Sequence, residues 1–118
     1  MRIAAVQDTP VYLNRVATTE RVVQRITEAG AGGADLIAFP EVFISGYPNW
    51  LDRTNGSAWE DPQQQEAFAR YLDQAVDVNG SEFGQVVTAV REARAFTYVG
   101  VVERAASGGS VYLSLIHI

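Results

Sequence analysis

The sequence predicts an α/β fold in which short buried strands alternate with amphipathic helices. Two apolar runs, within residues 2–7 and at 36–39, flank a segment with helical periodicity. A third apolar run, within residues 97–103, follows two further helical segments. Strand, helix and strand at this spacing indicate a right-handed parallel crossover, so the first two strands belong to one parallel sheet.

Turn-forming and capping residues mark the boundaries of the first predicted strand and the first predicted helix. The run from Arg2 to Gln7 is followed by Asp8-Thr9-Pro10, which predicts a strand buried on both faces and then a turn. From Asn14, a suitable N-cap, apolar residues recur at near-helical spacing. The glycine cluster Gly30–Gly33 follows this pattern and lacks a downstream Lys-Ser/Thr. It therefore predicts a helix C-terminus and not a phosphate-binding loop.

The second strand, Leu36–Phe39, presents a candidate catalytic carboxylate. Pro40 cannot donate a hydrogen bond to a neighbouring strand, so the strand ends there and Glu41 follows its carboxyl end. Open α/β sheets bind ligands at this edge. A carboxylate in this place is expected to be partly desolvated, with a raised pKa, and can act as a base. A strand-end glutamate that is solvated or paired to an arginine is the alternative.

The loop after Glu41 is rich in aromatic residues. Residues 43–60 contain the turn-forming residues Gly46 and Pro48, and four aromatic side chains: Phe43, Tyr47, Trp50 and Trp59. The loop is therefore predicted to form a pocket wall or an interface, with Tyr47 and Trp50 as the candidate residues. Core packing is equally compatible with these aromatic residues.

The second half of the chain predicts two helices and a hairpin. Asp61-Pro62 with Gln64 has the pattern of a capping box and begins a helix whose apolar stripe is Phe68, Leu72, Ala75 and Val76. Ser81 can cap the next helix, whose apolar stripe is Phe83, Val86, Val87 and Val90. The apolar runs 98–102 and 111–113 flank a glycine-containing turn at 105–109 and predict an antiparallel pair.

Composition excludes several classes of function. The 118 residues fit one domain, and the net charge of −5 argues against a nucleic-acid partner, because phosphate binding needs clustered basic residues. All nine Lys and Arg residues are arginine, and cysteine is absent. The first apolar run is too short for a signal peptide or a membrane span, which predicts a cytoplasmic protein with no membrane partner.

Two other chemistries are also disfavoured. His117 is the only histidine and lies in the last two residues, and Ser45 is not in a Gly-x-Ser-x-Gly segment, so no serine triad is predicted. Acidic residues are spread along helix faces and turns, so no metal site is predicted.

The segment Asp35–Trp50, which reads DLIAFPEVFISGYPNW, closely resembles the first signature of the nitrilase family of carbon-nitrogen hydrolases. Ile3–Gln7 is similar to the first strand of that family, and residues 97–104 with 110–112 resemble its next strand pair. The Gly-Tyr-Pro-x-Trp segment is closest to the true nitrilase branch. Ser45 is a departure, since many nitrilases have proline there.

The resemblance implies a fold and an activity. The fold would be the N-terminal part of a four-layer α-β-β-α sandwich, so residues 1–118 would be a partial domain truncated on its C-terminal side. Glu41 would be the general base. The cysteine nucleophile and the catalytic lysine of the family are absent from this sequence. The resemblance further implies a small nitrile substrate, no cofactor and a homo-oligomer at full length. The chain alone is expected to be inactive, because a base without its nucleophile cannot form the covalent intermediate.

Alternatives to this assignment remain at this point. One is an amidase-type relative, and another is a non-catalytic α/β ligand-binding or assembly module in which Glu41 is structural. Residues 113–118 depart from the family pattern and are read either as a non-native tail or as a strand.

Overall fold

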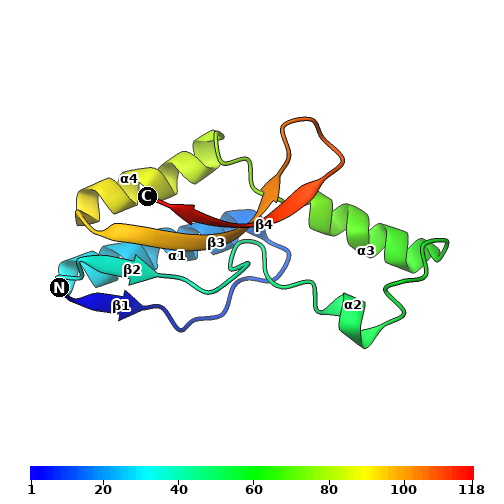
Figure 1. Cartoon of the computed structure of the whole chain (residues 1–118), viewed down its shortest axis with the longest axis horizontal. Coiled ribbons are helices and arrows are strands. Elements are labelled where there is room, and N and C mark those ends of the chain that lie inside the picture. Colours follow the sequence, from blue (N-terminus) through cyan, green and yellow to red (C-terminus); the bar gives the residue numbers. More distant parts are fainter.

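Four strands form one mixed sheet in the order β1-β2-β3-β4 (Figure 1). The computed structural model describes residues 1–118, in which the strands are β1 (Ile3–Ala5), β2 (Leu36–Ala38), β3 (Phe96–Arg104) and β4 (Val111–His117). The first three strands are parallel, and β4 pairs with β3 in the antiparallel sense. Both the parallel crossover and the hairpin are thereby confirmed.

The helices are α1 (Arg15–Ala31), α2 (Trp50–Arg53), α3 (Pro62–Asp73) and α4 (Ser81–Ala93). The predicted N-caps of α1 and α3 are confirmed: Asn14 Oδ1 accepts from the Ala17 amide at 3.0 Å, and Asp61 Oδ1 accepts from the Gln63 amide at 2.8 Å. The predicted cap of α4 is wrong. Gly80 is its N-cap, and Ser81 is already the first helical residue.

The capping box at the start of α3 is also wrong. The Gln64 side chain does not return to the helix start, because its Nε2 donates to Thr54 Oγ1 at 2.9 Å. This bond ties α3 to the segment just after α2, a helix that the sequence did not predict.

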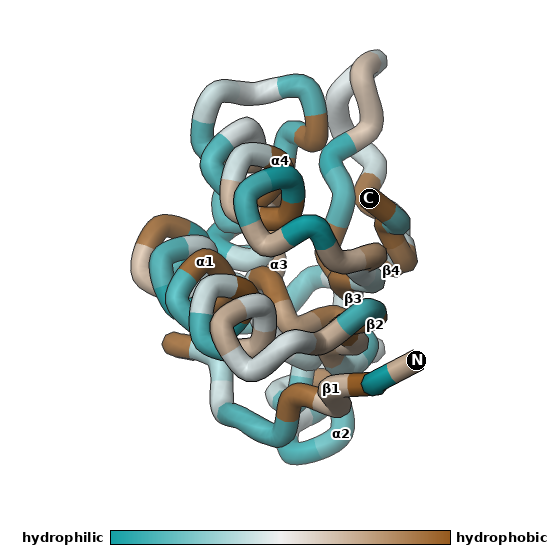
Figure 2. Tube along the Cα trace, turned by 90° about the vertical axis from the view of Figure 1, so that its left-hand side faces the viewer, coloured by the Kyte–Doolittle hydropathy of each residue, from teal (hydrophilic) through white to brown (hydrophobic).

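Helices α1 and α4 lie side by side and cover one face of the sheet (Figures 1 and 2). They approach closely at Gly30, where an added Cβ would lie 2.7 Å from the Ala93 Cβ. The main core fills the space between these helices and the sheet and includes Val22, Ile26, Ile37, Val86 and Val99, each 0% exposed. The chain therefore forms two layers of the predicted sandwich, one of helices and one of sheet.

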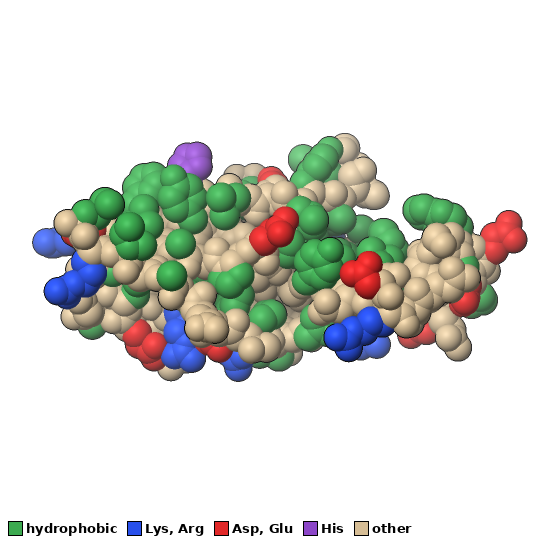
Figure 3. Space-filling view, turned by 60° about the horizontal axis from the view of Figure 1, so that its bottom comes forward, with side chains coloured by type: hydrophobic (Ala, Val, Ile, Leu, Met, Phe, Trp, Pro, Cys, Tyr) green, Lys and Arg blue, Asp and Glu red, His purple; other side chains and the backbone are tan.

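The opposite face of the sheet is uncovered over β1, β2 and the start of β3, although Val102 near the end of β3 is 0% exposed. Strand register places Ile3 beside Leu36 and Leu36 beside Phe96 in one row. Ile3 is 57% exposed and Phe96 is 49% exposed. Figure 3 shows hydrophobic side chains gathered on this side of the molecule, near His117. The prediction that the first strand is buried on both faces is therefore wrong, because β1 is an edge strand with helices on one side only.

Helices α2 and α3 form an arm that extends beyond the sheet (Figure 1), in a molecule measuring 50 × 28 × 20 Å. Tyr71 is the one buried residue of α3, and it packs with Val42, Ala75 and Val102 in a second, smaller core. The predicted stripe is therefore only partly correct. Ala75 and Val76 are buried but follow the end of α3 at Asp73, and Tyr71 was not predicted.

Residues 113–117 belong to β4 and pair with β3, from Leu113 opposite Val102 to His117 opposite Tyr98. The segment thus forms an acceptable strand, which is one of the two interpretations given above. That it is non-native stays a prediction.

Candidate active site

A cavity of about 310 Å³ lies beside the loops that follow β1 and β2. It is lined from the first loop by Asp8, Thr9, Pro10 and Tyr12, and from the second by Pro40, Glu41, Val42, Phe43, Tyr47 and Asn49. Because both strands are parallel, these loops leave the same edge of the sheet. The predicted place of Glu41, just past the carboxyl end of the second strand, is confirmed.

Glu41 lies in a short excursion of the chain above β3. The Phe39 amide donates to the Tyr98 carbonyl at 2.9 Å, and the Ile44 amide donates to the Gly100 carbonyl at 3.1 Å. The four residues 40–43 between these two bonds leave the ladder, and the backbone of residues 40–42 lies against Gly100 of β3. Glu41 lies within this excursion and lines the cavity.

The environment of the Glu41 carboxylate is only partly as predicted. Its side chain is exposed, so the expected partial desolvation is wrong for this chain. Val42 and Phe43 next to it are buried, but the Glu41 side chain points away from both cores and stays open to water. None of the four ion pairs involves Glu41, so pairing to an arginine is also wrong. The exposed Glu41 carboxylate is therefore solvated, which is the other half of the alternative given above.

Asp8 is a second carboxylate in the cavity, and the sequence assigned it only to a turn. Its Oδ2 accepts a hydrogen bond from Arg25 Nε at 2.6 Å. This bond from Arg25, with a smaller contribution from the Thr9 amide, lowers the pKa of Asp8. Asp8 is therefore held ionised and oriented by Arg25, whereas Glu41 has no ion-pair partner. The partner, Arg25, belongs to α1 and is distant in sequence, so no local pattern indicated this pairing.

Tyr47 and Trp50 have different environments. Tyr47 lines the cavity and is 49% exposed, so its assignment to a pocket wall fits its position. Trp50 does not line the cavity. Its ring centroid lies 5.0 Å from that of Tyr71 and 6.0 Å from that of Phe68. These edge-on contacts pack α2 against α3, which is the core-packing alternative.

Tyr12 is a cavity residue that sequence reasoning missed. Burial raises its pKa, an effect partly offset by the Asn49 backbone. The phenol is therefore neutral at pH 7 and can donate a hydrogen bond. Its ring also explains Gly46, whose φ is +99° and where an added Cβ would lie 2.7 Å from Tyr12 Cδ2.

Ser45 follows the excursion and differs from the family pattern at a buried position. It is 0% exposed, and its hydroxyl donates to the Gln74 carbonyl, just beyond α3. The serine therefore joins the aromatic loop to the end of the arm, a contact that proline could not make.

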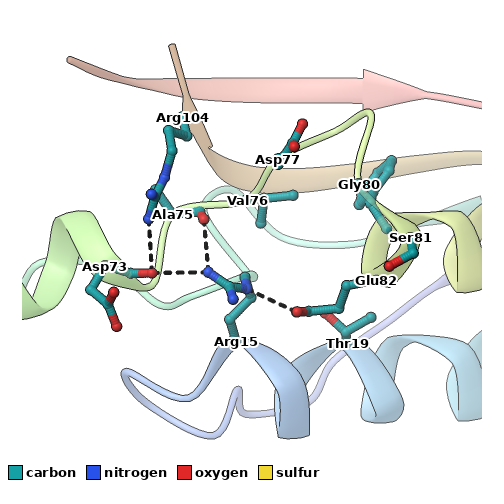
Figure 4. A pocket seen from close by; sticks show the side chains of 11 residues that line it. Arg15, Thr19, Asp73, Ala75, Val76, Asp77, Gly80, Ser81, Glu82 and Arg104 are labelled. Carbon is teal, nitrogen blue, oxygen red and sulfur yellow. Dashed lines mark hydrogen bonds and ion pairs between the residues drawn. The ribbon is translucent and has the colours of Figure 1, made fainter. Parts of the chain in front are cut away.

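A second cavity, of about 390 Å³, lies between α1, the end of α3 and α4 (Figure 4). Arg15 Nη1 donates to the carbonyls of Asp73 at 2.9 Å and Ala75 at 3.1 Å, and Arg15 Nε pairs with Glu82 at 2.9 Å. Arg104 Nη2 donates to the carbonyls of Leu72 at 2.8 Å and Asp73 at 3.0 Å. These two arginines, the arginine clamp, satisfy carbonyl groups at the C-terminal end of α3. The charged residues that line this cavity therefore have a structural role, because they attach the end of α3 to its neighbours.

The fold and the first cavity together place a carboxylate with no ion-pair partner at the carboxyl edge of parallel strands, where open α/β sheets bind ligands. The family model of the carbon-nitrogen hydrolases matches residues 2–118. The chain belongs to the carbon-nitrogen hydrolase family.

Three relatives show which members of this family the chain is similar to. The chain is 37% identical over 116 residues to an aliphatic nitrilase of Sinorhizobium fredii (strain HH103), covering 98% of this chain and 37% of the relative. It is 32% identical over 114 residues to an arylacetonitrilase of Aspergillus oryzae, covering 97% of this chain and 32% of the relative. It is 34% identical over 117 residues to a cyanide hydratase of Armillaria gallica, covering 99% and 31%. The chain thus spans about a third of the length of these relatives.

No helix of the structure is both long enough and apolar enough to span a membrane.

Proposed function

We propose that the chain is the N-terminal part of a nitrilase that hydrolyses a nitrile to a carboxylic acid and ammonia, with Glu41 as the general base. One observation carries the proposal: within the nitrilase-like motif, Glu41 lies in a cavity at the carboxyl edge of the parallel strands with no ion-pair partner. The names of the relatives support a nitrile-type substrate, since each refers to a nitrile or to cyanide.

The chemistry assigns one proton transfer to this chain. Glu41 takes the proton of a cysteine thiol as the sulfur attacks the nitrile carbon, and the nitrile nitrogen is protonated to give a thioimidate. A first water adds to the thioimidate carbon and the C–N bond breaks, releasing ammonia and leaving a thioester. A second water breaks the C–S bond, which releases the acid and restores the thiol. In the complete enzyme a lysine stabilises the charge that develops in the tetrahedral species.

The chain alone is proposed to be inactive. It contains neither cysteine nor lysine, so the thioimidate cannot form on it. Incubating the purified chain with an aliphatic nitrile or an arylacetonitrile should release no ammonia. Ammonia release that scales with the concentration of the chain would contradict this.

The test of the proposed function uses a chimera. The chain replaces the matched segment of the Sinorhizobium fredii aliphatic nitrilase, which supplies the rest of the enzyme. The chimera should hydrolyse aliphatic nitriles, and Glu41→Gln should lower kcat by at least about a hundredfold, because general-base catalysis contributes on that order. Glu60→Gln is the matched control, since Glu60 is exposed and lies outside the cavity.

The outcomes of the chimera test separate the alternatives. Unchanged hydrolysis of nitriles by the Glu41→Gln chimera would contradict the general-base role and favour a structural role for Glu41. Hydrolysis of amides with no hydrolysis of nitriles would favour the amidase-type alternative.

The complete enzyme is proposed to be a homo-oligomer. Support comes from the family resemblance, which implies association at full length. Cytoplasmic localisation stays a prediction from the sequence.

A further inference from the structure

Gly100 lies in the middle of β3, directly beneath the chain segment that carries Glu41. A Cβ added at Gly100 would lie 2.3 Å from the Pro40 carbonyl oxygen, 2.6 Å from the Val42 amide nitrogen and 2.8 Å from Glu41 Cα. All three atoms belong to the backbone, so no side-chain rotation can relieve the overlap. A side chain at position 100 would therefore displace the excursion itself.

The excursion is held on both sides of this contact. Phe39 and Ile44 bond to the carbonyls of Tyr98 and Gly100, at 2.9 and 3.1 Å, so both its ends are fixed to β3. A bulkier residue at 100 could not shift one end alone. The segment between these anchors would have to rise from the sheet, and Glu41 would rise with it.

Val42 adds a second constraint next to Glu41. Its φ is +52°, a conformation that is strained for a β-branched residue. Its side chain is 1% exposed and packs with Tyr71, Ala75 and Val102. The buried side chain therefore holds Val42 in a left-handed conformation that fixes the direction of the chain after Glu41.

We propose that Gly100 is a positioning residue for Glu41: its missing side chain lets the backbone of Pro40, Glu41 and Val42 lie flat on β3, which sets where the Glu41 carboxylate enters the cavity. The effect on catalysis rests on the proposed function, but the backbone contact does not. The two parts can therefore fail separately.

The contact is tested on the unaltered chain by NMR. The Gly100 Hα protons should give nuclear Overhauser effects to the Glu41 Hα and to the Val42 amide proton. The left-handed φ of Val42 should give a strong intraresidue amide-to-Hα effect. Absence of the Gly100 effects in the folded chain would overturn the proposal, whatever happens to any variant.

The second test compares Gly100→Ala with Gly84→Ala. An added Cβ at Gly84 meets no atom within 4 Å, which makes Gly84 the matched control. Gly100→Ala should shift the amide signals of residues 40–43 and weaken the Val42 signature while those of α1 and α4 are retained, and Gly84→Ala should leave residues 40–43 unchanged. A folded Gly100→Ala chain with the Val42 signature intact would overturn the proposal.

The catalytic consequence is tested in the chimera. Per folded protein, Gly100→Ala should lower kcat by about a hundredfold with KM changed less than about twofold, because a displaced base slows the chemical step without altering nitrile binding. The acid limb of the kcat profile against pH, which reports the base, should move in Gly100→Ala and not in Gly84→Ala.

The outcomes in the chimera distinguish the two proposals. If Glu41→Gln retains full activity, the proposed function fails while the NMR contact of Gly100 still stands. If Glu41→Gln is inactive and Gly100→Ala has wild-type kcat and pH profile, the function stands and the positioning role is overturned.

Discussion

Two carboxylates line the same cavity in different electrostatic settings, since Asp8 is paired to Arg25 and Glu41 has no partner. The Arg25 bond holds the pKa of Asp8 below its ordinary value of 3.8, so the folded state binds the Asp8 proton less readily than the unfolded chain. The stability from this pair is therefore fully present above pH 3.8 and is lost as the pH falls through the lower folded value.

Asp8→Asn should consequently lower the thermal midpoint at neutral pH, with a difference from the unaltered chain that shrinks below pH 3.8. Circular dichroism melts across this pH range measure it. Asp52→Asn is the control, because Asp52 is exposed and takes part in none of the ion pairs. A difference for Asp8→Asn that stays constant down to acid pH would contradict the pairing.

Tyr71 predicts the opposite pH dependence. Burial raises its pKa far above the ordinary value of 10.0, with smaller contributions from Tyr12 and Tyr47. The unfolded chain ionises this phenol near pH 10 and the folded chain does not, so stability is full below pH 10 and falls above it.

Tyr71→Phe should remove that alkaline loss. Its hydroxyl has no hydrogen-bond partner among the residues of the chain, so the variant should stay within about 1 kcal/mol of the unaltered chain at neutral pH. Urea unfolding at neutral and alkaline pH measures both effects. Tyr112→Phe, at a 59% exposed position, should keep the alkaline loss.

At the residue scale, the position of a side chain at the end of a strand was more predictable than its exposure to solvent. Pro40 was enough to place Glu41 at the end of β2, because a missing amide donor ends a strand wherever it occurs. Its exposure could not be read locally, since it depends on whether another layer covers that face of the sheet. Gly100 did leave a signal, because an isolated glycine inside an apolar strand run marks a close backbone approach.

At the scale of elements, the contact between α1 and α4 depends on a small residue. Gly30→Ala would place a Cβ 2.7 Å from the Ala93 Cβ, so the helices must separate or shift. We expect a loss of about 1–3 kcal/mol, the usual cost of overpacking. Gly84→Ala should instead stabilise the chain by roughly 0.5–1 kcal/mol, because alanine is the better helix former and meets no neighbour there.

Chemical denaturation of the two variants measures this contrast. The same sign of change in both would contradict a packing role for Gly30, since helix propensity alone favours alanine at each position.

Helix and strand types were predictable where the pattern was local. The caps Asn14 and Asp61 act within one turn, so their side-chain chemistry was sufficient. At the start of α4, Gly80 and Ser81 both fit the cap, and only the path of the preceding chain selects Gly80. The one-turn helix α2 had no periodic signal, because four residues are too few to show one.

At the scale of the whole molecule, the uncovered part of the sheet and the projecting arm leave the chain with excess surface. Its accessible area is 7189 Å². A compact monomer of 12.9 kDa exposes about 6,300 Å². The excess is close to the roughly 800 Å² that each partner buries in a standard protein interface. The chain is therefore expected to self-associate through this face at high concentration.

Leu115→Asp should weaken this association, because it puts a charge on a face where Leu115 is 59% exposed. Sedimentation velocity over a concentration series measures it. Val16→Asp is the control, since Val16 is 52% exposed but lies on α1. A chain that stays monomeric throughout, or an equal effect of both substitutions, would contradict self-association through the sheet.

The two-layer arrangement was predictable, but the projecting arm was not. Alternating runs and helical stripes determine which faces are apolar and hence how α1 and α4 cover the sheet. The direction of α2 and α3 depends on contacts between distant residues, such as Arg104 with Leu72, which no local pattern encodes.

The arginine clamp has a consequence for local opening. Helix α3 contributes one buried side chain, and its C-terminal end is attached through donors that belong to α1 and β3. Regions with few buried contacts exchange their amide protons first. Amide hydrogens of α3 should therefore exchange well before those of α1 and α4, and a protease should cut the arm while the sheet and its helices stay intact.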